Sequence, residues 1–286
     1  MTLEKAIKKV KPLDRNAMDI AQKRWDSIAK PLHSLGKLET LLIQIAGITG
    51  NAEIDLSKRG LIAMCADNGV VEEGVTQTGQ EVTAIVAENF LNYDTSVGVM
   101  CKQNHAEIFP VDMGMITDTK VRTDHKVAYG TKNMTKGPAM TREQAVKGIE
   151  SGIAMVEELK GKGYKILATG EMGIGNTTTS SAVASVLLNQ PVEEMTGRGA
   201  GLTSEGLARK IGAIRKAIKL NQPDPSDAVD VLAKVGGLDI AGMAGVFLGG
   251  AIYGIPVVMD GFISCVSALI AMQICPAAGD YMIASH

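Results

Sequence analysis

Short apolar runs that each end in Asp or Gly are the feature that most constrains how this chain can fold. Four of them occur along the sequence, at 61–66, 106–114, 164–173 and 255–261. Runs of this kind are typical of strands buried on both faces, and helical periodicity fills the segments between them. Strands that alternate with helices predict an α/β fold, a Rossmann-like three-layer arrangement around a mostly parallel sheet. Ligands of such sheets bind at the carboxyl ends of the strands.

Apolar spacing and capping residues predict the helices. Asp14 is placed to cap the first long helix, and Thr203 or Ser204 begins a later one. The predicted helices lie at 15–30, 34–50, 80–92, 140–160, 177–188, 203–220 and 238–254. In the helix at 203–220 the expected apolar face consists of Leu207, Ile211, Ile214 and Ile218.

The chain also divides along its length. Residues 1–50 are predicted to form the helical segment of a small accessory domain, and residues 51–286 the α/β domain. The polar segment 117–136 is predicted to be a long loop.

Composition excludes several classes of protein. Lys and Arg number 29 and Asp and Glu 31, which gives a net charge of −2 without blocks of like charge, so neither nucleic acid nor an anionic membrane surface is an expected partner. The four cysteines lack C-x-x-C spacing and the four histidines lack metal-ligand spacing. We therefore expect reduced thiols, a cytoplasmic location, and neither a metal nor a cofactor. Glycines interrupt the uncharged stretch 240–259, which favours buried elements over a membrane hairpin.

The stretch ATGEMGIGNTTTSSAVASVLL, at 168–188, joins a predicted strand to a predicted helix through a glycine turn. Gly170 and Gly175 have the spacing of a phosphate-binding P-loop, but Asn176 stands where that motif has lysine. Thr177 or Thr178 is expected to cap the helix, whose backbone N–H groups favour an anion. Without the lysine, a phosphate monoester fits better than a triphosphate. The alternative is a turn that only lets the helix pack on the sheet.

Each charged residue near the glycine loops could have either a functional or a purely structural role. Glu171 could orient a hydroxyl group or face a developing cation, or it could simply pair with a lysine. Beside the second glycine cluster at 197–201, Arg198, Arg209 and Lys210 could supply charge to a phosphate. For Arg209 and Lys210 alone, the sequence favours a solvated basic helix face.

The loop at 67–83 is the third polar cluster. Its adjacent Glu72 and Glu73 point apart on an extended chain, so a solvated turn is expected rather than a two-carboxylate catalytic site. Gln77 and Gln80 could hydrogen-bond a flat nitrogenous ring.

Taken together, these stretches resemble the nicotinate-nucleotide:dimethylbenzimidazole phosphoribosyltransferase family of cobalamin lower-ligand synthesis. The resemblance covers nearly the whole chain in family order, and GEMGIGNTT at 170–178 is its most specific string. The other matching segments are 30–39, 66–83, 111–115, 137–145, 197–201, 236–245 and 259–263. The resemblance implies transfer of phosphoribose from nicotinate mononucleotide to a benzimidazole, without metal or cofactor, by a homodimer with a Rossmann-like large domain and a small helical one.

The resemblance also implies roles for particular residues. Glu171 is the catalytic candidate, and Lys210 lies near the phosphate of the mononucleotide. The residues implied to bind substrate are Met172, Gly173, Ile174, Gly175, Asn176, Thr177, Thr178, Gly199, Gly201, Lys210, Thr76, Gln77 and Gln80. Among these, Thr76, Gln77, Gln80 and Met172 are implied to line the pocket of the incoming base.

Three features depart from the family pattern. The family's general base is a glutamate expected beyond His286, a role that Glu171 could only partly replace. Asn68 stands where many relatives have histidine, and Thr76-Gln77-Thr78 replaces a different common sequence. The accepted base therefore stays open among a benzimidazole, a purine and a phenol. Two other functions also stay open: a non-catalytic protein that binds mononucleotide or benzimidazole, and a P-loop-type NTPase with 257–260 as a Walker-B-like strand end.

Overall fold

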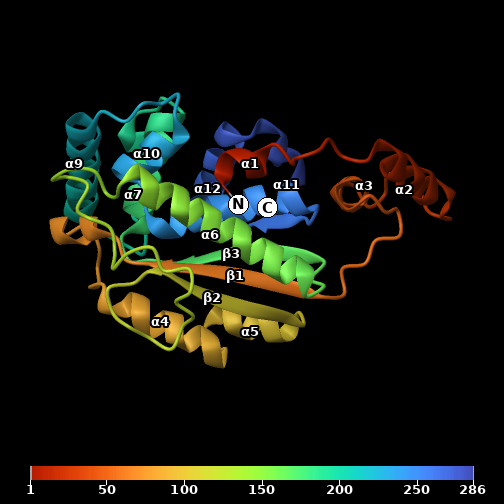
Figure 1. Cartoon of the computed structure of the whole chain (residues 1–286), viewed down its shortest axis with the longest axis horizontal. Coiled ribbons are helices and arrows are strands. Elements are labelled where there is room, and N and C mark those ends of the chain that lie inside the picture. Colours follow the sequence, from red (N-terminus) through yellow and green to blue (C-terminus); the bar gives the residue numbers. More distant parts are fainter. Residues whose placement is uncertain (1, 286) are drawn as a thin grey trace.

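The computed structural model describes residues 2–285, and within that range a single parallel sheet of five strands forms the centre of the molecule (Figure 1). The strand order is β2-β1-β3-β4-β5, and every neighbouring pair is parallel. Their bounds are β1 Arg59–Ala66, β2 Ala106–Gly114, β3 Ile166–Met172, β4 Val257–Met259 and β5 Met282–Ala284. The predicted α/β fold is confirmed, and each of the four apolar runs contains a strand.

Helices cover the sheet on both faces and make the three layers (Figure 1). On one face lie α4 (Glu81–Asn92) and α5 (Ser96–Gln103), which pack on β2. On the other lie α6 (Arg142–Gly161), α7 (Asn176–Leu187), α11 (Leu238–Tyr253) and α12 (Phe262–Ile274). The sequence did not predict α5, α12, the short β5, α8 (Val192–Met195) or α10 (Ala228–Val235).

The N-terminal helices are α1 (Leu3–Ile7), α2 (Arg15–Ser27) and α3 (Lys37–Thr49). Figure 1 shows α2 and α3 side by side beyond one end of the sheet. The expected cap is confirmed, because the Asp14 carboxylate accepts a hydrogen bond from the Ala17 N–H at 3.0 Å. Gln44 Nε2 of α3 donates to the Asp280 and Met282 carbonyls, so α3 is tied to the C-terminal elements. The domain boundary at residue 50 stays a prediction.

The packing of α6 against α11 is unusually close. A Cβ atom at Gly152 would lie 2.0 Å from the Gly242 carbonyl oxygen, and one at Gly245 would lie 2.0 Å from the Ile149 carbonyl oxygen. The two backbones therefore touch, and glycine is required on both helices. This packing explains the uncharged stretch of the sequence, since α11 is buried on all sides along most of its length. Among residues 2–285, no helix is both long and apolar enough to cross a membrane.

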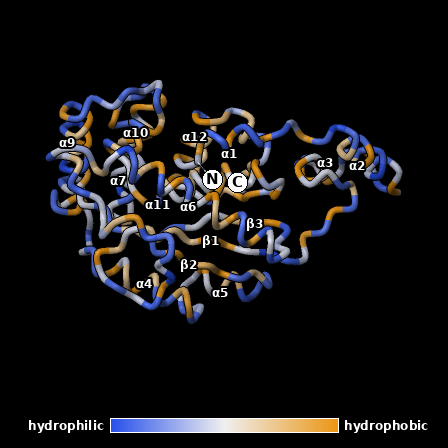
Figure 2. The backbone as a smooth tube through the Cα atoms, viewed as in Figure 1, coloured by the Kyte–Doolittle hydropathy of each residue, from blue (hydrophilic) through white to orange (hydrophobic). Residues whose placement is uncertain are grey.

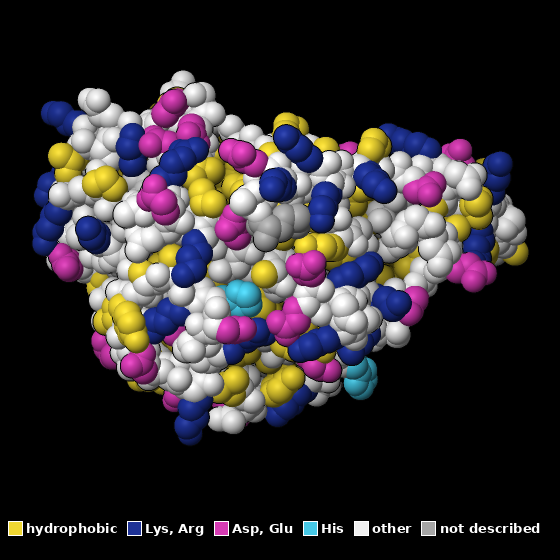
Figure 3. All heavy atoms as spheres, viewed as in Figure 1, with side chains coloured by type: hydrophobic (Ala, Val, Ile, Leu, Met, Phe, Trp, Pro, Cys, Tyr) yellow, Lys and Arg dark blue, Asp and Glu magenta, His cyan; other side chains and the backbone are white. Residues whose placement is uncertain are grey.

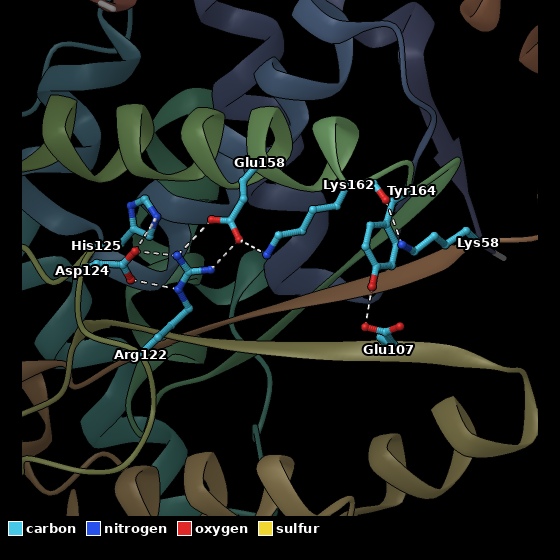
Figure 4. Close-up of polar contacts among 8 residues, drawn as sticks. All are labelled: Lys58, Glu107, Arg122, Asp124, His125, Glu158, Lys162 and Tyr164. Atoms are coloured by element: carbon cyan, nitrogen blue, oxygen red, sulfur yellow. Dashed lines mark hydrogen bonds and ion pairs between the residues drawn. The ribbon is translucent and has the colours of Figure 1, made fainter.

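The long loop between β2 and α6 is confirmed, and a charged network fastens it to α6 (Figure 4). Arg122 in the loop bonds both Asp124 and Glu158 of α6, the latter at 3.0 Å, and Lys162 adds a 2.7 Å bond to Glu158. The Arg122 guanidinium and Lys162 lower the pKa of Glu158 to about 2. A neighbouring cluster consists of Tyr164, Glu107 and Lys58. The Tyr164 hydroxyl donates to the Glu107 carboxylate, and Lys58 lies over the Tyr164 ring.

Helix α9 (Ser204–Asn221) begins where predicted, with Thr203 as its cap, but its buried face differs from the expected one. The buried residues are Gly206, Lys210, Ala213, Ile214 and Ala217. Of the four apolar residues expected there, only Ile214 is fully buried, and the others are half-buried. The buried face is rotated because it is centred on small residues that let α9 approach α7. The alternation of polar and apolar segments along α9 and α4 is visible in Figure 2.

The adjacent acidic pair of the loop at 67–83 lies in a turn, as expected, but the premise of an extended chain is wrong. Glu72 and Glu73 lie in a 3₁₀ turn, η1 (Gly69–Glu73), and not on an extended chain, so their side chains converge. Both accept from Asn133 Nδ2, at 3.2 and 2.7 Å, and Glu72 also pairs with Lys136. The pair fastens the loop at 131–136.

On the face seen in Figure 3, side chains of both charge signs are interspersed.

Candidate functional site

The glycine turn after β3 has the strand–turn–helix form that its sequence predicted. β3 ends at Glu171 and Met172, and α7 begins at Asn176. The expected threonine cap is wrong, because Gly175 takes the N-cap position with φ +97° and no side chain caps the helix. The Asn176 and Thr178 N–H groups donate to the Gly173 and Gly175 carbonyls, and the Thr177 hydroxyl is available to a partner from another helix.

Lys210 of α9 is that partner, and it is buried with only 1% of its surface exposed. Its Nζ donates to Thr177 Oγ1 at 2.9 Å and to the Gly197 carbonyl at 3.2 Å. Within residues 2–285 it forms no ion pair, and burial lowers its pKa to about 8. The solvated reading is thus wrong for Lys210. It holds for Arg209, which is exposed.

A cavity of about 460 Å³ opens beside this lysine. Gly199 approaches closely, since a Cβ on it would lie 3.0 Å from Thr177 Oγ1 and 3.5 Å from Lys210 Nζ. Its φ of +56° also favours glycine. Glu194 also lines this cavity, but it does not pair with the lysine. A buried ammonium that forms no ion pair, a threonine hydroxyl and a helix N-terminus together form a site for one small anion.

Glu171 lines a second cavity of about 310 Å³, together with Thr169, Gly170 and Asp260. Its Oε2 accepts from Asn176 Nδ2 at 2.5 Å. Burial, with the nearby Asp239 second, raises the pKa of Glu171 to about 7. The lysine-pair reading of Glu171 is wrong, because no cation pairs with it in the part of the chain that the structure describes.

The structure brings some of the sequence-predicted residues together and leaves others apart. Gln77 Nε2 donates to the Gly201 carbonyl at 2.5 Å, which joins the loop at 67–83 to the second glycine cluster. Gln80 Nε2 reaches only the Asn68 carbonyl, at 3.2 Å, and Thr76 bonds locally to the Thr78 carbonyl.

The residues of the glycine turn itself face in several directions. Met172 packs with the cluster around Phe90, and the Ile174 N–H donates to Thr83 Oγ1 at 3.2 Å. Gly173 is buried, and Thr178 is buried with its hydroxyl unpartnered and does not line the cavity beside Lys210.

Sequence reasoning missed Asp239, the carboxylate nearest to Glu171. It lies fully buried in the first turn of α11, and its Oδ2 accepts from Asn176 Nδ2 at 2.9 Å. Burial raises the pKa of Asp239 to about 6. One signal pointed to it: an acidic residue shortly after Gly236-Gly237 and at the start of an otherwise uncharged helix.

The anion site and the carboxylate pair lie at the carboxyl ends of the strands, which is where parallel α/β sheets bind their ligands. Residues 10–286 match a family model described as Phosphoribosyltransferase. The class of the protein follows from this match.

The relatives narrow the class. The chain is 51% identical to the nicotinate-nucleotide–dimethylbenzimidazole phosphoribosyltransferase of Ruminiclostridium cellulolyticum, over 100% of this chain and 82% of that protein. It is 49% identical to the protein of that name from Clostridium acetobutylicum, with the same coverage. A crystal structure of CobT from Thermus thermophilus superposes with a TM-score of 0.88, at 33% identity over 95% of this chain and 82% of the other. The chain belongs to the nicotinate-nucleotide–dimethylbenzimidazole phosphoribosyltransferase family.

Proposed function

We propose that this chain transfers the phosphoribosyl group of nicotinate mononucleotide to 5,6-dimethylbenzimidazole or a related base, giving α-ribazole 5′-phosphate and nicotinate. The observation that carries the proposal is the buried Lys210, which forms no ion pair among the described residues and faces a cavity lined by Thr177, Gly197, Gly199 and the exposed Glu194. A phosphate monoester supplies the missing negative charge. Asn176 is neutral, and its amide donates to two carboxylates. The loop therefore offers no second cation for a triphosphate.

The donor spans the two cavities in this proposal. With the phosphate beside Lys210 and Thr177, the ribose extends along the first turn of α7 toward Glu171. Met172, Gln77 and Gln80 then border the space for the acceptor base. Gly199 and Gly201 let the loop backbone close over the nucleotide without side chains.

The chemistry breaks the bond between the anomeric carbon and the pyridinium nitrogen of nicotinate. The electron pair goes to that nitrogen, which becomes neutral, and positive charge builds on the ribose. A ring nitrogen of the acceptor forms the new bond, and the N–H proton of the acceptor leaves to a general base. An ionised Glu171 stabilises the developing cation. We place the general base beyond His286, as the family resemblance implies.

Assembly and location complete the proposal. We infer a homodimer in the cytoplasm, in which residues 1–50 belong to a small domain. Large apolar side chains stand exposed around α2 and α3, and they offer a surface that a second copy would cover. These residues are Ile20, Ile28, Leu32, Leu35 and Leu38. Sedimentation equilibrium of Leu32→Glu, against the native chain, tests the dimer.

The test of function is nicotinate release from nicotinate mononucleotide, followed chromatographically with and without 5,6-dimethylbenzimidazole. Release that depends on the base supports the transferase. Nucleotide binding by calorimetry without any release would instead favour a binding protein, and thermal stabilisation by ATP with phosphate release would favour an NTPase. The same assay on a chain extended beyond His286 tests the location of the general base, since activity in both chains would give that role to Glu171.

A further inference from the structure

Two carboxyl groups, the half-buried Glu171 and the fully buried Asp239, share a single amide at the centre of the site. Asn176 Nδ2 donates to Glu171 Oε2 at 2.5 Å and to Asp239 Oδ2 at 2.9 Å. An amide nitrogen carries two hydrogens, so this contact uses both of them. The two carboxyls come from β3 and α11, and the amide that joins them comes from the start of α7.

The surroundings give this pair no cation. Within residues 2–285, neither Glu171 nor Asp239 forms an ion pair. The other charged or titratable groups facing them are acidic: Asp260 after β4, Asp67 after β1, and the Cys65 thiol of β1. Asp112 of β2 also faces Cys65, but it is paired with Lys126 at 3.0 Å. Like charges in a dry site cannot both ionise freely, so the pair favours holding a proton.

The fold fixes Asp239 more firmly than Glu171. Its Oδ1 accepts from the Ile240 N–H at 3.0 Å. A Cβ at Gly173 would lie 2.4 Å from Asp239 Oδ2, and one at Gly237 would lie 2.5 Å from Asp239 Oδ1. Any side chain at either glycine would displace this carboxylate. Asp239 lines neither cavity, whereas Glu171 lines the cavity of about 310 Å³.

We propose that Asp239 is a positioning residue, which acts through the Asn176 amide to aim the Glu171 carboxyl at the cavity and to keep it protonated until the pyridinium nucleotide binds. The proposal rests on the proposed function, because that reaction supplies the cation. When the pyridinium nucleotide binds, its charge favours ionisation of both carboxyls, and the proton on Glu171 leaves to solvent. After nicotinate and product depart, the pair takes the proton up again.

The experiment compares the pH dependence of kcat/KM for nicotinate release in the native chain and its variants. In the native chain kcat/KM rises with pH as Glu171 ionises near neutral pH, which gives the pH profile a rising limb. Glu171→Gln should abolish this limb and so assign it to Glu171. Asp239→Asn removes the like charge, so the limb moves to lower pH by about one unit. Asn176→Ala removes a hydrogen bond that favours ionised Glu171, so the limb moves to higher pH. Asp124→Asn, the same chemical change in the surface network, leaves the limb in place.

Opposite shifts in the two variants are the signature that a merely structural role would not produce. Lower rates with an unmoved limb, in variants whose circular dichroism and melting are native-like, would overturn the proposal. No nicotinate release at any pH, either from this chain or from one extended beyond His286, would sink the proposed function itself. In that case carbon-13 NMR of labelled glutamate carboxyls measures the titration midpoint of Glu171 directly. A lower midpoint in Asp239→Asn supports the proposed role of Asp239, and an unchanged midpoint overturns it.

Discussion

Two acidic clusters of this molecule place carboxylates in opposite electrostatic situations. On the surface, Glu158 meets Arg122 and Lys162, which lower its pKa to about 2 (Figure 4). At the carboxyl ends of the strands, Glu171 meets Asp239 and one neutral amide, and its pKa rises to about 7. One carboxyl is charged at every physiological pH, and the other changes charge within that range.

The difference teaches what each cluster can do. A fully paired carboxylate fixes a loop in place, but it attracts a cationic ligand only weakly because its charge is already balanced by neighbouring cations. The buried pair costs stability in its ionised form and recovers it when a cation arrives. Two such groups, one of each sign, lie where we place the substrate: Lys210 on the phosphate side and Glu171 on the ribose side.

The largest expected effect comes from removing the charge of the buried cluster. Glu171→Gln keeps the shape of the side chain but cannot ionise, so nicotinate release should fall by about 100-fold or more. Steady-state rates at pH 8, where the native carboxyl is ionised, measure this effect. Glu158→Gln is the matched change in the surface cluster and should leave the rate within about twofold. Equal losses of rate in both variants would contradict a catalytic role that is specific to Glu171.

The lysine offers the next sharpest contrast. Lys210→Met removes the phosphate partner, so the KM for nicotinate mononucleotide should rise by about 30-fold, while the melting temperature stays level or rises because an unpaired buried ammonium is gone. Lys219→Met, an exposed change on the same helix, should alter neither. Substrate affinity in the native chain should also weaken above about pH 8, where Lys210 loses its proton. A KM unaffected by Lys210→Met would remove the phosphate from this cavity.

Unfolding free energies should respond to pH in opposite directions at the two clusters. Glu158 has a lowered pKa, so its contribution is present above pH 4.5 and is lost as the pH falls toward 2. Glu171 has a raised pKa, so its contribution is present below pH 4.5 and is lost as the pH rises through 7. Urea unfolding should show Glu158→Gln less stable than the native chain by about 1 kcal/mol at pH 7, and Glu171→Gln more stable by about 1 kcal/mol at pH 8. Parallel pH trends would contradict the assignment.

The smallest effect tests the edge of the surface network. Tyr164→Phe removes the hydrogen bond to Glu107 while its ring keeps the contact with Lys58, whose Nζ lies 4.4 Å from the ring centroid. We expect a loss of about 0.5–1 kcal/mol in the free energy of unfolding and no change in nicotinate release. A change in KM from this variant would mean that the two clusters are coupled across the sheet.

Local rules were enough to predict most of the fold. Each apolar run formed a strand because its residues are buried on both faces, and Asp14 and Thr203 capped helices through contacts only three residues away. Elements that depend on neighbours distant in sequence were missed. The three-residue β5 exists because it pairs with β4, and nothing within 282–284 marks it as a strand.

The candidate site divides in the same way. The glycine turn at 170–175 has its own sequence signal, but the burial of Lys210 depends on how α9 packs on α7, and the partnership of Asp239 with Glu171 joins residues that are far apart in the sequence. Spacing within one segment cannot reveal either. The capping threonine failed for a related reason, since Thr177 bonds to Lys210 from another helix instead of to its own backbone.

The backbone contact between α6 and α11 has a consequence for motion. No side chain lies between Gly152 and Gly245, so no rotamer change can let α11 slide or turn against α6. Asp239, in the first turn of α11, therefore belongs to a helix whose position is fixed by backbone contact. The opposite wall is an exposed loop with left-handed glycines at 199 and 201. We therefore expect that, when a nucleotide binds, the backbone adjusts in the loop at 197–201 rather than in α11.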